Sequence, residues 1–309
     1  MSVFTIAIHG GAGTILRTDM SAEKEQAYRH SLSQAIDAGY SVLEKGGSAV
    51  EAVKASVVTL EDDPLFNAGR GSVFAKNGKQ EMDASIMDGS CLKAGAVAAV
   101  KNVRNPIMLA ALVMNKSQHV MLLGEGAESF ARMHGISFEK DDYFYSEFRH
   151  RQWQQLKGSE ATALDHDVQA DKKFGTVGAV ACDSRGNLAA ATSTGGMTNK
   201  DFGRIGDSPI IGAGTYANNS TCAISCTGHG EPFIRAVTAY DVSCLMEYKG
   251  LSLKEAMDIV VHDKLIRLDG EGGMIGVDAR GHAELIFNSE GMYRGFRSSD
   301  NSSEISIYK

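Results

Sequence analysis

The sequence KKFGTVGAVACD, residues 172–183, decides the fold because the character of the chain changes inside it. A charged stretch without helical or strand periodicity ends at Gly175, and Thr176 opens an apolar run typical of a buried strand. The turn SRGN and a second apolar run, LAAATSTGG (residues 188–196), follow directly and predict a hairpin. In that hairpin Thr194 lies across from Thr176, where its hydroxyl could reach the first.

Thr176 becomes a candidate nucleophile if the chain is cut after Gly175. A threonine hydroxyl is weak until a base adjoins it. The cut would give Thr176 a free α-amine, which titrates near about 8 rather than near about 10.4 as lysine does, and could be that base. Gly175 would leave the scissile carbonyl unhindered. Threonine also favours strands, so the dipeptide alone leaves both interpretations open.

The rest of the chain predicts an α+β protein with mainly antiparallel sheets and helices outside them. A strand at 3–8 is followed by helices at 21–45 and 48–61, a hairpin turning at Asn77–Gly78, and further strands and hairpins. A single long helix is expected near 232–248. Residues 139–175 are rich in charge and lack either period, which predicts an exposed connector, helical at first, that is open to cutting.

Composition excludes several classes of protein. The 309 residues carry a net charge of −7 and no basic stripe, which argues against a nucleic-acid partner. Five cysteines, an odd number without a close-set framework, indicate reduced thiols. The N-terminal apolar run is too short for a signal peptide or a membrane span. We therefore expect a cytoplasmic protein with neither membrane nor nucleic acid as partner.

Two glycine-rich loops after the hairpin carry groups that could bind an amino acid. GRIGDSP supplies Arg204, whose guanidinium can hold a carboxylate, and Asp207, which can hold an ammonium. CTGHGE supplies the Thr227 hydroxyl and the Gly228 amide, which could form an oxyanion hole. A surface charge pair and an ordinary turn would explain the same residues. His229 has no evident acid or metal partner in the sequence and is assigned to the loop.

Taken together, HGGAG, DDPLFNAGRGSVF, MDASIMDG, GTVGAVA, ATSTGGMTNK, GRIGDSP and CTGHGE resemble the plant-type L-asparaginases, also called isoaspartyl peptidases. These belong to the N-terminal-nucleophile hydrolases, and the resemblance runs to about residue 295. It implies a four-layer αββα sandwich, made as one domain (1–309) and matured by self-cleavage into an α chain (1–175) and a β chain (176–309). It also implies an (αβ)2 assembly.

The resemblance gives each candidate residue a role in cleaving isoaspartyl dipeptides and L-asparagine. Thr176 is the nucleophile and Thr194 supports it, while Asn67 helps to hold the active threonine. Thr227 and Gly228 form the oxyanion hole, and Gly175 and Thr176 flank the cleavage site. The substrate loops are 204–207 and 227–230, whose members are Arg204, Ile205, Gly206, Asp207, Thr227, Gly228, His229 and Gly230.

The same resemblance implies that no cofactor is needed for chemistry but that a loop is tied around a structural sodium ion. A helix that ends near Glu61 leaves carbonyls that a hard cation can accept. A turn satisfied by water would serve equally well. The main-chain carbonyls that match belong to Leu60, Glu61, Asp63, Phe66, Ala68 and Arg70.

Three alternatives remain at this point. A glycosylasparaginase-like amidase is disfavoured because Trp153, in the connector, is the only tryptophan and none lies near the first strand. An α/β-hydrolase would need a nucleophile elbow at Ser193, but Ala191 stands where that motif has glycine. A non-catalytic amino-acid-binding protein could use Arg204 and Asp207 without turnover, and only cutting of the chain separates it from the hydrolase.

Overall fold

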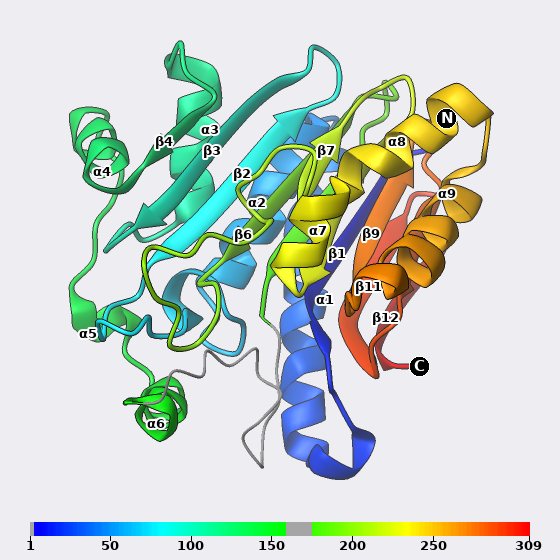
Figure 1. The fold of residues 1–309 in the computed structure, drawn as a ribbon. Helices are drawn as coiled ribbons and strands as arrows, with labels where there is room; N and C mark the ends of the chain where they lie inside the picture. The colour runs from blue at the N-terminus through cyan, green and yellow to red at the C-terminus, as the bar shows by residue number, and fades with distance from the viewer. Residues whose placement is uncertain (1–2, 159–174) are drawn as a thin grey trace.

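The computed structural model describes residues 3–158 and 175–309, which fold into two β-sheets and accompanying helices (Figure 1). The α+β class predicted from the sequence is confirmed. In the large sheet all neighbours are antiparallel except the last pair. Its order is β12 (Ser303–Tyr308), β11 (Gly291–Ser298), β1 (Thr5–Gly13), β5 (Val177–Cys182), β6 (Leu188–Thr194), β2 (Met82–Asp88), β3 (Lys93–Val100) and β4 (Met121–Leu123).

The small sheet is antiparallel throughout and packs against the middle of the large one. Its order is β10 (Ala283–Phe287), β9 (Gly272–Asp278), β8 (Cys222–Gly228) and β7 (Thr215–Ala217). Strands β8 and β9 contact β5 and β1 of the large sheet, so the predicted hairpin β5–β6 lies at the junction of the two sheets. The start of β5, one residue after Thr176, therefore lies where the two sheets meet.

Two groups of helices accompany the sheets. The large sheet is contacted by α1 (Ala22–Glu44), α2 (Ala49–Glu61), α3 (Pro106–Lys116) and α4 (Gly124–Met133). The small sheet is contacted by α7 (Gly230–Ala236), α8 (Thr238–Lys249) and α9 (Leu253–Ile259). The shorter helical segments are η1 (Arg17–Asp19), η2 (Gly69–Gly71), α5 (Asp141–Phe144), α6 (Glu147–Leu156), the π-helical turn η3 (Val260–Lys264) and η4 (Ile266–Leu268).

The alternation of side chains along single strands explains why the strands around the site are buried on both faces. In β1, Ile6 and Ile8 belong to the core that includes α1 and α2, whereas Ala7 between them belongs to the core between the sheets. In β8, Ile224 joins the core under α8 and α9, and Ala223 faces the large sheet. The inter-sheet core is rich in small residues, among them Ala7, Ala190 and Ala223.

The structure corrects the expected connector. Residues 141–156 contain α5 and α6, and four of their side chains are buried, although we expected this segment to be exposed. Arg149 is only 2% exposed and donates through Nε to the Gly71 carbonyl at 3.1 Å. The high charge of this segment led us to miss a short amphipathic pattern, whose buried members are Phe144, Arg149, Trp153 and Leu156. Residues 159–174 of the predicted connector lie outside the described residues.

Two local predictions were also wrong. The expected helix at 232–248 is divided into α7 and α8 by Val237, which adopts a left-handed conformation with φ of 51°. A turn does form at Asn77–Gly78, where the Ala75 amide donates to the Lys79 carbonyl at 2.8 Å, but it joins none of the described strands, and the strand hairpin is β2–β3. The segment before β2 makes other bonds, because the Val73 amide donates to Asn67 Oδ1 and the Lys76 amide donates to the Lys200 carbonyl.

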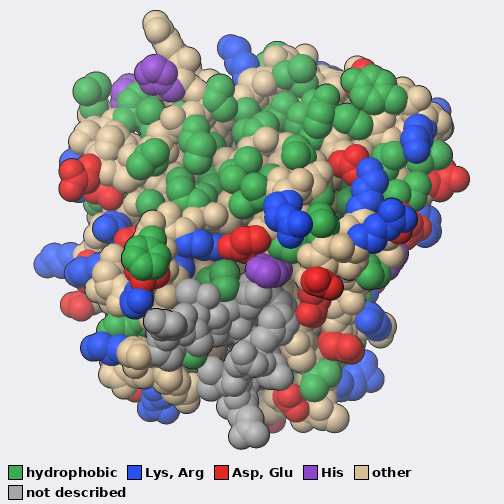
Figure 2. Space-filling view, in the orientation of Figure 1, with side chains coloured by type: hydrophobic (Ala, Val, Ile, Leu, Met, Phe, Trp, Pro, Cys, Tyr) green, Lys and Arg blue, Asp and Glu red, His purple; other side chains and the backbone are tan. Residues whose placement is uncertain are grey.

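The surface carries charges of both signs. On the face drawn in Figure 2, lysine and arginine side chains are interspersed with aspartate and glutamate, and hydrophobic side chains are scattered over its upper half. Within the described ranges, no helix is both long enough and apolar enough to cross a bilayer.

Candidate active site

Thr176 lies one residue before β5, at the edge of the buried region. Its Oγ1 donates a hydrogen bond to Thr194 Oγ1 at 3.2 Å. The contact follows from the antiparallel register of the hairpin, in which Val177 pairs with Ser193. Thr176 is partly exposed, whereas Thr194 is buried. The structure thus brings the two predicted hydroxyls together at one end of the sheet.

Gly175 packs directly on Asn67. A Cβ atom added to Gly175 would lie 1.8 Å from Asn67 Cβ, so only glycine fits here. The Asn67 side chain is itself fixed, because Nδ2 donates to the Gly196 carbonyl at 2.7 Å and Oδ1 accepts from the Val73 amide at 3.0 Å. The main-chain carbonyl of Asn67 accepts a hydrogen bond from the Gly195 amide at 3.0 Å. Asn67 therefore joins the residue before Thr176 to the turn after Thr194.

Thr227 and Gly228 end β8 close to β1. The Thr227 side chain is buried, and its Oγ1 accepts a hydrogen bond from the Ala12 amide at 3.3 Å. Because that bond occupies a lone pair of the oxygen, the hydroxyl proton is free to point to another acceptor. Gly228 has φ of 148°, and a Cβ there would lie 2.4 Å from the Glu271 carbonyl oxygen. The pair lies beside β1, the strand that also borders Thr176.

Arg204 does not have a free guanidinium. Its Nε and Nη2 donate to the two carboxylate oxygens of Glu231, each at 2.9 Å. His229 Nε2 lies 3.1 Å from the same carboxylate. Burial alone would raise the pKa of Glu231, but hydrogen bonds from His229 and Arg204, with the charge of Arg204, hold it well below its usual range. His229, assigned to the loop for want of an acid partner, has one two residues later.

Asp207 is a buried carboxylate that is only partly satisfied. It is 3% exposed, and among the described residues its Oδ2 has no hydrogen-bond partner. Burial raises the pKa of Asp207 to about 7, although the charge of Arg204 opposes the shift. A Cβ on Gly230 would lie 3.0 Å from both Asp207 Oδ1 and Arg204 Nη2. The two predicted substrate loops therefore meet at Gly230, beside an acid that can accept a cationic donor.

Two further members of the first substrate loop lie between these charges. Ile205 is half-buried and Gly206 is buried. A Cβ on Gly206 would lie 3.0 Å from Arg204 Nη1, so glycine leaves space for the guanidinium.

The predicted cation loop runs from the end of α2 to η2. A Cβ on Gly69 would lie 2.5 Å from the Glu61 carbonyl oxygen, and one on Gly71 would lie 1.9 Å from that of Phe66. The glycines thus let the chain close tightly around these carbonyls. The Leu60, Asp63 and Ala68 carbonyls already accept backbone amides at 3.1 to 3.4 Å. In the described ranges no group of three acidic, histidine or cysteine side chains could hold a metal.

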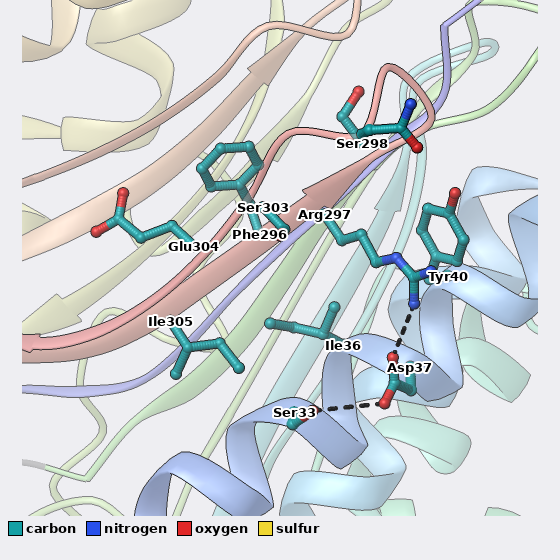
Figure 3. A pocket seen from close by; sticks show the side chains of 11 residues that line it. Ser33, Ile36, Asp37, Tyr40, Phe296, Arg297, Ser298, Ser303, Glu304 and Ile305 are labelled. Atoms are coloured by element: carbon teal, nitrogen blue, oxygen red, sulfur yellow. Dashed lines mark hydrogen bonds and ion pairs between the residues drawn. The ribbon is translucent and has the colours of Figure 1, made fainter.

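A separate cavity of about 510 Å³ lies between α1 and the β11–β12 end of the large sheet (Figure 3). Arg297 in its wall donates to Asp37 at 3.1 Å and lies over the Tyr40 ring. None of the predicted catalytic or substrate residues lines it. The one arginine that lines this cavity is already paired with Asp37.

Sequence reasoning missed two residues that touch the candidate site. Glu231 pairs with Arg204, and His9 Nδ1 contacts the Thr176 carbonyl at 3.0 Å. Both stand inside motifs that the sequence analysis singled out, CTGHGE and HGGAG. The position of Glu231 two residues after His229 was a usable signal for Glu231. His9 offered none, because its partner lies on another strand far along the chain.

A threonine pair at a Gly–Thr step, an asparagine clamp and an arginine–aspartate loop are features of an amidohydrolase with an N-terminal threonine nucleophile. The chain belongs to the asparaginase family: a family model described as Asparaginase matches residues 2–307.

Curated relatives match the full length of this chain and carry names of the same enzyme class. An isoaspartyl peptidase of Salmonella typhimurium is 51% identical over 312 residues, and the alignment covers all of both chains. An isoaspartyl peptidase of Escherichia coli is also 51% identical, covering all of this chain and 97% of the relative. A probable isoaspartyl peptidase/L-asparaginase 2 of Arabidopsis thaliana is 41% identical, with all of both chains covered.

Proposed function

We propose that this protein is an isoaspartyl peptidase and L-asparaginase that matures by cutting itself between Gly175 and Thr176. The single observation that carries the proposal is the 3.2 Å contact between the Thr176 and Thr194 hydroxyls at a Gly–Thr step. The names of the full-length relatives support the substrate class. The products are L-aspartate and the amine released from it.

Maturation begins with attack of Thr176 Oγ1 on the carbonyl carbon of Gly175. The C–N bond breaks, the amine of Thr176 takes a proton, and an ester links the two residues until water hydrolyses it. The close contact of Gly175 with Asn67 supports this step, because a residue gripped on one side resists movement while its carbonyl is attacked.

Turnover uses the α-amine that the cut creates. The neutral amine accepts the Thr176 hydroxyl proton as Oγ1 attacks the side-chain carbonyl of the substrate. The Thr227 hydroxyl and the Gly228 amide stabilise the oxyanion. The leaving amine takes the proton, a β-aspartyl ester remains on Thr176, and water hydrolyses it. No organic cofactor enters either half of the reaction.

Recognition of the head group falls to Arg204 and Asp207. Asp207 Oδ2, which has no hydrogen-bond partner in the described part of the chain, accepts the α-ammonium, and the raised pKa of the Asp207 carboxyl falls when that cation arrives. The α-carboxylate pairs with Arg204, and must share or displace the carboxylate of Glu231. The exchange replaces one anion with another, so Arg204 is never left buried without a partner. Ile205, Gly206, His229 and Gly230 shape the walls of this pocket.

Several wider features belong to the same proposal. The four-layer αββα sandwich is supported by three separate cores, one between the sheets and one on the outer side of each. Main-chain carbonyls of the loop from Leu60 to Arg70 would hold a sodium ion, which stabilises the loop bearing Asn67 and takes no part in the chemistry. We further propose that the cut chains assemble as (αβ)2 and work in the cytoplasm.

The alternatives are not favoured. The full-length relatives carry isoaspartyl peptidase and L-asparaginase names rather than those of glycosylasparaginases. A non-catalytic amino-acid-binding protein would have no use for paired hydroxyls beside Gly175. In the α/β-hydrolase alternative Ser193 would have to be accessible, but it is fully buried and donates to Glu61 Oε1 at 2.6 Å.

The test is amine release from β-Asp-Leu, α-Asp-Leu, asparagine and glutamine by the matured protein. In β-Asp-Leu and asparagine both head groups are free, whereas the bond in α-Asp-Leu consumes the carboxylate that Arg204 binds. Because α-Asp-Leu offers Arg204 no anion to exchange for Glu231 and presents a different carbonyl to Thr176, we expect its hydrolysis to be slower by roughly 10²-fold or more. Glutamine should also be poor, because its carbonyl is displaced by one methylene, and small misplacements can cost about 10²-fold. Comparable rates on the two Asp-Leu isomers would reject the proposed binding mode.

A further inference from the structure

The imidazole of His9 lies wholly inside the molecule and contacts the backbone of Thr176. His9 is 0% exposed, and its Nδ1 lies 3.0 Å from the Thr176 carbonyl oxygen. A carbonyl oxygen can only accept, so Nδ1 must carry the proton and donate it. Burial lowers the pKa of His9 to about 3, although the bond to Thr176 opposes the shift. The ring is therefore neutral at working pH, with its second nitrogen left as an acceptor.

A chain of buried hydroxyls supplies that acceptor with a donor. Ser225 Oγ lies 2.9 Å from His9 Nε2, and Thr192 Oγ1 lies 2.7 Å from Ser225 Oγ. Thr215 donates to Thr192 in turn, and Ser85 lies 2.7 Å from Thr215. Because Nε2 must accept, the hydroxyls of Thr215, Thr192 and Ser225 can each donate in the direction of His9. The ring is thereby held in a single tautomer.

The far end of this chain reaches the substrate loop. Ser85 Oγ also lies 2.6 Å from the carbonyl of Ser208, the residue after Asp207. The chain crosses between the two sheets, since Ser85 and Thr192 lie in the large sheet and Thr215 and Ser225 in the small one.

Gly178 makes room for this arrangement. It pairs with His9 across β1 and β5, and a Cβ on it would lie 2.4 Å from His9 Nε2 and 2.0 Å from Ser225 Oγ. Any larger residue would separate the ring from its hydroxyl donor. Gly178 therefore leaves the space in which His9 bonds Ser225, just as Gly175 leaves the space for its contact with Asn67.

The proposed cut creates a need for such a bond. Once the Gly175–Thr176 peptide is broken, Thr176 becomes a chain terminus, and termini fray unless they are tied down. The contact of Gly175 with Asn67 then no longer restrains Thr176. Among the described residues, two side chains still bond Thr176: Thr194 contacts its hydroxyl, a bond that the reaction itself disturbs, and His9 contacts its carbonyl.

We propose that His9 is a positioning residue that tethers Thr176 after cleavage, and that the hydroxyl chain from Thr215 to Ser225 sets its ring. The inference rests on the proposed function, because it concerns the matured terminus. The bond fixes the backbone of Thr176 and so directs its amine and hydroxyl toward substrate. His9 does not touch the reacting atoms, so its loss should lower kcat while KM, set by Arg204 and Asp207, changes little.

A matched pair of variants tests the tether. In His9→Asn the side-chain amide can occupy the place of Nδ1 and still donate to the Thr176 carbonyl. In His9→Gln the longer side chain carries the amide toward Ser225 and loses that bond. We expect kcat to fall by roughly 10²-fold in His9→Gln, the cost of a small misplacement, and to be largely retained in His9→Asn. Equal losses in the two variants, or wild-type kcat in matured His9→Gln, would overturn the inference.

Ser225→Ala provides a second test that leaves His9 in place and decides the matter if a His9 variant does not fold or mature. Without its donor the ring can turn, so kcat should fall at unchanged KM, less than in His9→Gln. The control is Ser243→Ala, which removes an equally buried hydroxyl bonded to Thr221 at 2.6 Å, away from the site. Unchanged kcat in Ser225→Ala overturns the inference.

The proposed function and the His9 tether are contradicted by different results. A wild-type chain that matures but does not release amine from β-Asp-Leu contradicts the proposed function, whatever the His9 variants do. An active wild type with unaffected His9→Gln and Ser225→Ala contradicts only the tether.

Discussion

The surroundings of Thr176 and of Asp207 differ in the kind of interaction that holds them. Thr176 is surrounded by neutral groups: the Thr194 hydroxyl, the Asn67 amide behind Gly175 and an uncharged His9. Asp207 lies beside Arg204, whose partner is the carboxylate of Glu231. Neutral contacts at close range fix geometry and depend little on pH or salt, whereas buried charges depend on both. The difference separates positioning from recognition within one site.

The largest expected effect is in the neutral region. Thr176→Ala lacks the nucleophile for both steps, so the chain should stay full length and amine release should fall by roughly 10⁴-fold or more. Intact-mass spectrometry and β-Asp-Leu hydrolysis measure the two. Thr221→Ala, which removes a buried hydroxyl elsewhere, should mature and turn over normally. A purified Thr176→Ala chain that still divides after Gly175 without protease would remove Thr176 from the mechanism.

Gly175→Ala separates maturation from turnover. The added methyl group would lie 1.8 Å from Asn67 Cβ, so the scissile peptide must shift, and maturation should slow by roughly 10²-fold. Protein that does mature should show ordinary kcat, because residue 175 then belongs to the other chain. The control is Gly126→Ala, where no heavy atom lies within 4 Å of the new methyl group. Maturation at the wild-type rate would mean that the contact with Asn67 plays no part.

Arg204→Lys addresses the charged region. The lysine keeps the charge but loses the forked pair of donors, so KM for β-Asp-Leu should rise roughly 10- to 100-fold while maturation proceeds normally. Steady-state kinetics on the matured variant give the measurement. Arg297→Lys, in the separate cavity of Figure 3, is the matched control and should leave KM unchanged. An unaltered KM in Arg204→Lys would move the substrate carboxylate elsewhere.

The smallest effect concerns stability and pH. Burial raises the pKa of Asp207 from 3.8 to about 7, so the unfolded chain loses this proton first as pH rises. The folded state is therefore progressively destabilised between about pH 4 and pH 7. Asp207→Asn cannot ionise, and its unfolding midpoint should exceed that of the wild type by a few degrees above pH 7, since about 1 kcal/mol moves the midpoint of a large domain by roughly 2–4 °C.

The advantage of Asp207→Asn should shrink as pH falls toward about 4. Asp263→Asn, at an exposed aspartate, should show no such trend. Thermal unfolding followed across this pH range makes the comparison. A midpoint difference that is constant with pH would contradict the assignment of a buried, ionising carboxylate to this position.

The sequence was sufficient to predict what depends on local pattern. The β5–β6 hairpin and the meeting of Thr176 with Thr194 follow from two apolar runs and a four-residue turn. For Gly175 the expected reason was incomplete, because the glycine is needed for space against Asn67. That contact joins segments far apart in the chain. Periodicity carries no information about such a pair.

The same limit explains the missed residues. His9 bonds Ser225 across two different sheets, and the partner of a buried histidine depends on how the sheets pack. Glu231 lies in a motif that the sequence analysis had singled out, but its pairing with Arg204 depends on how two separate loops fold together. The break between α7 and α8 could not be predicted, because valine, unlike proline or glycine, does not ordinarily end a helix. The α8 amides of Ala239 and Tyr240 instead bond loop carbonyls of residues 213 and 212.

The burial of Trp153 in α6 gives the protein an intrinsic optical probe. It is the only tryptophan, it is 9% exposed, and its ring centroid lies 5.9 Å from that of Phe74. Phe74 follows Val73, whose amide bonds the Asn67 side chain. Ultraviolet emission from this single indole therefore arises at the seam between α6 and the loop that supports the cleavage site. A red shift during maturation would report α6 lifting into water, and a constant spectrum would report that it stays in place.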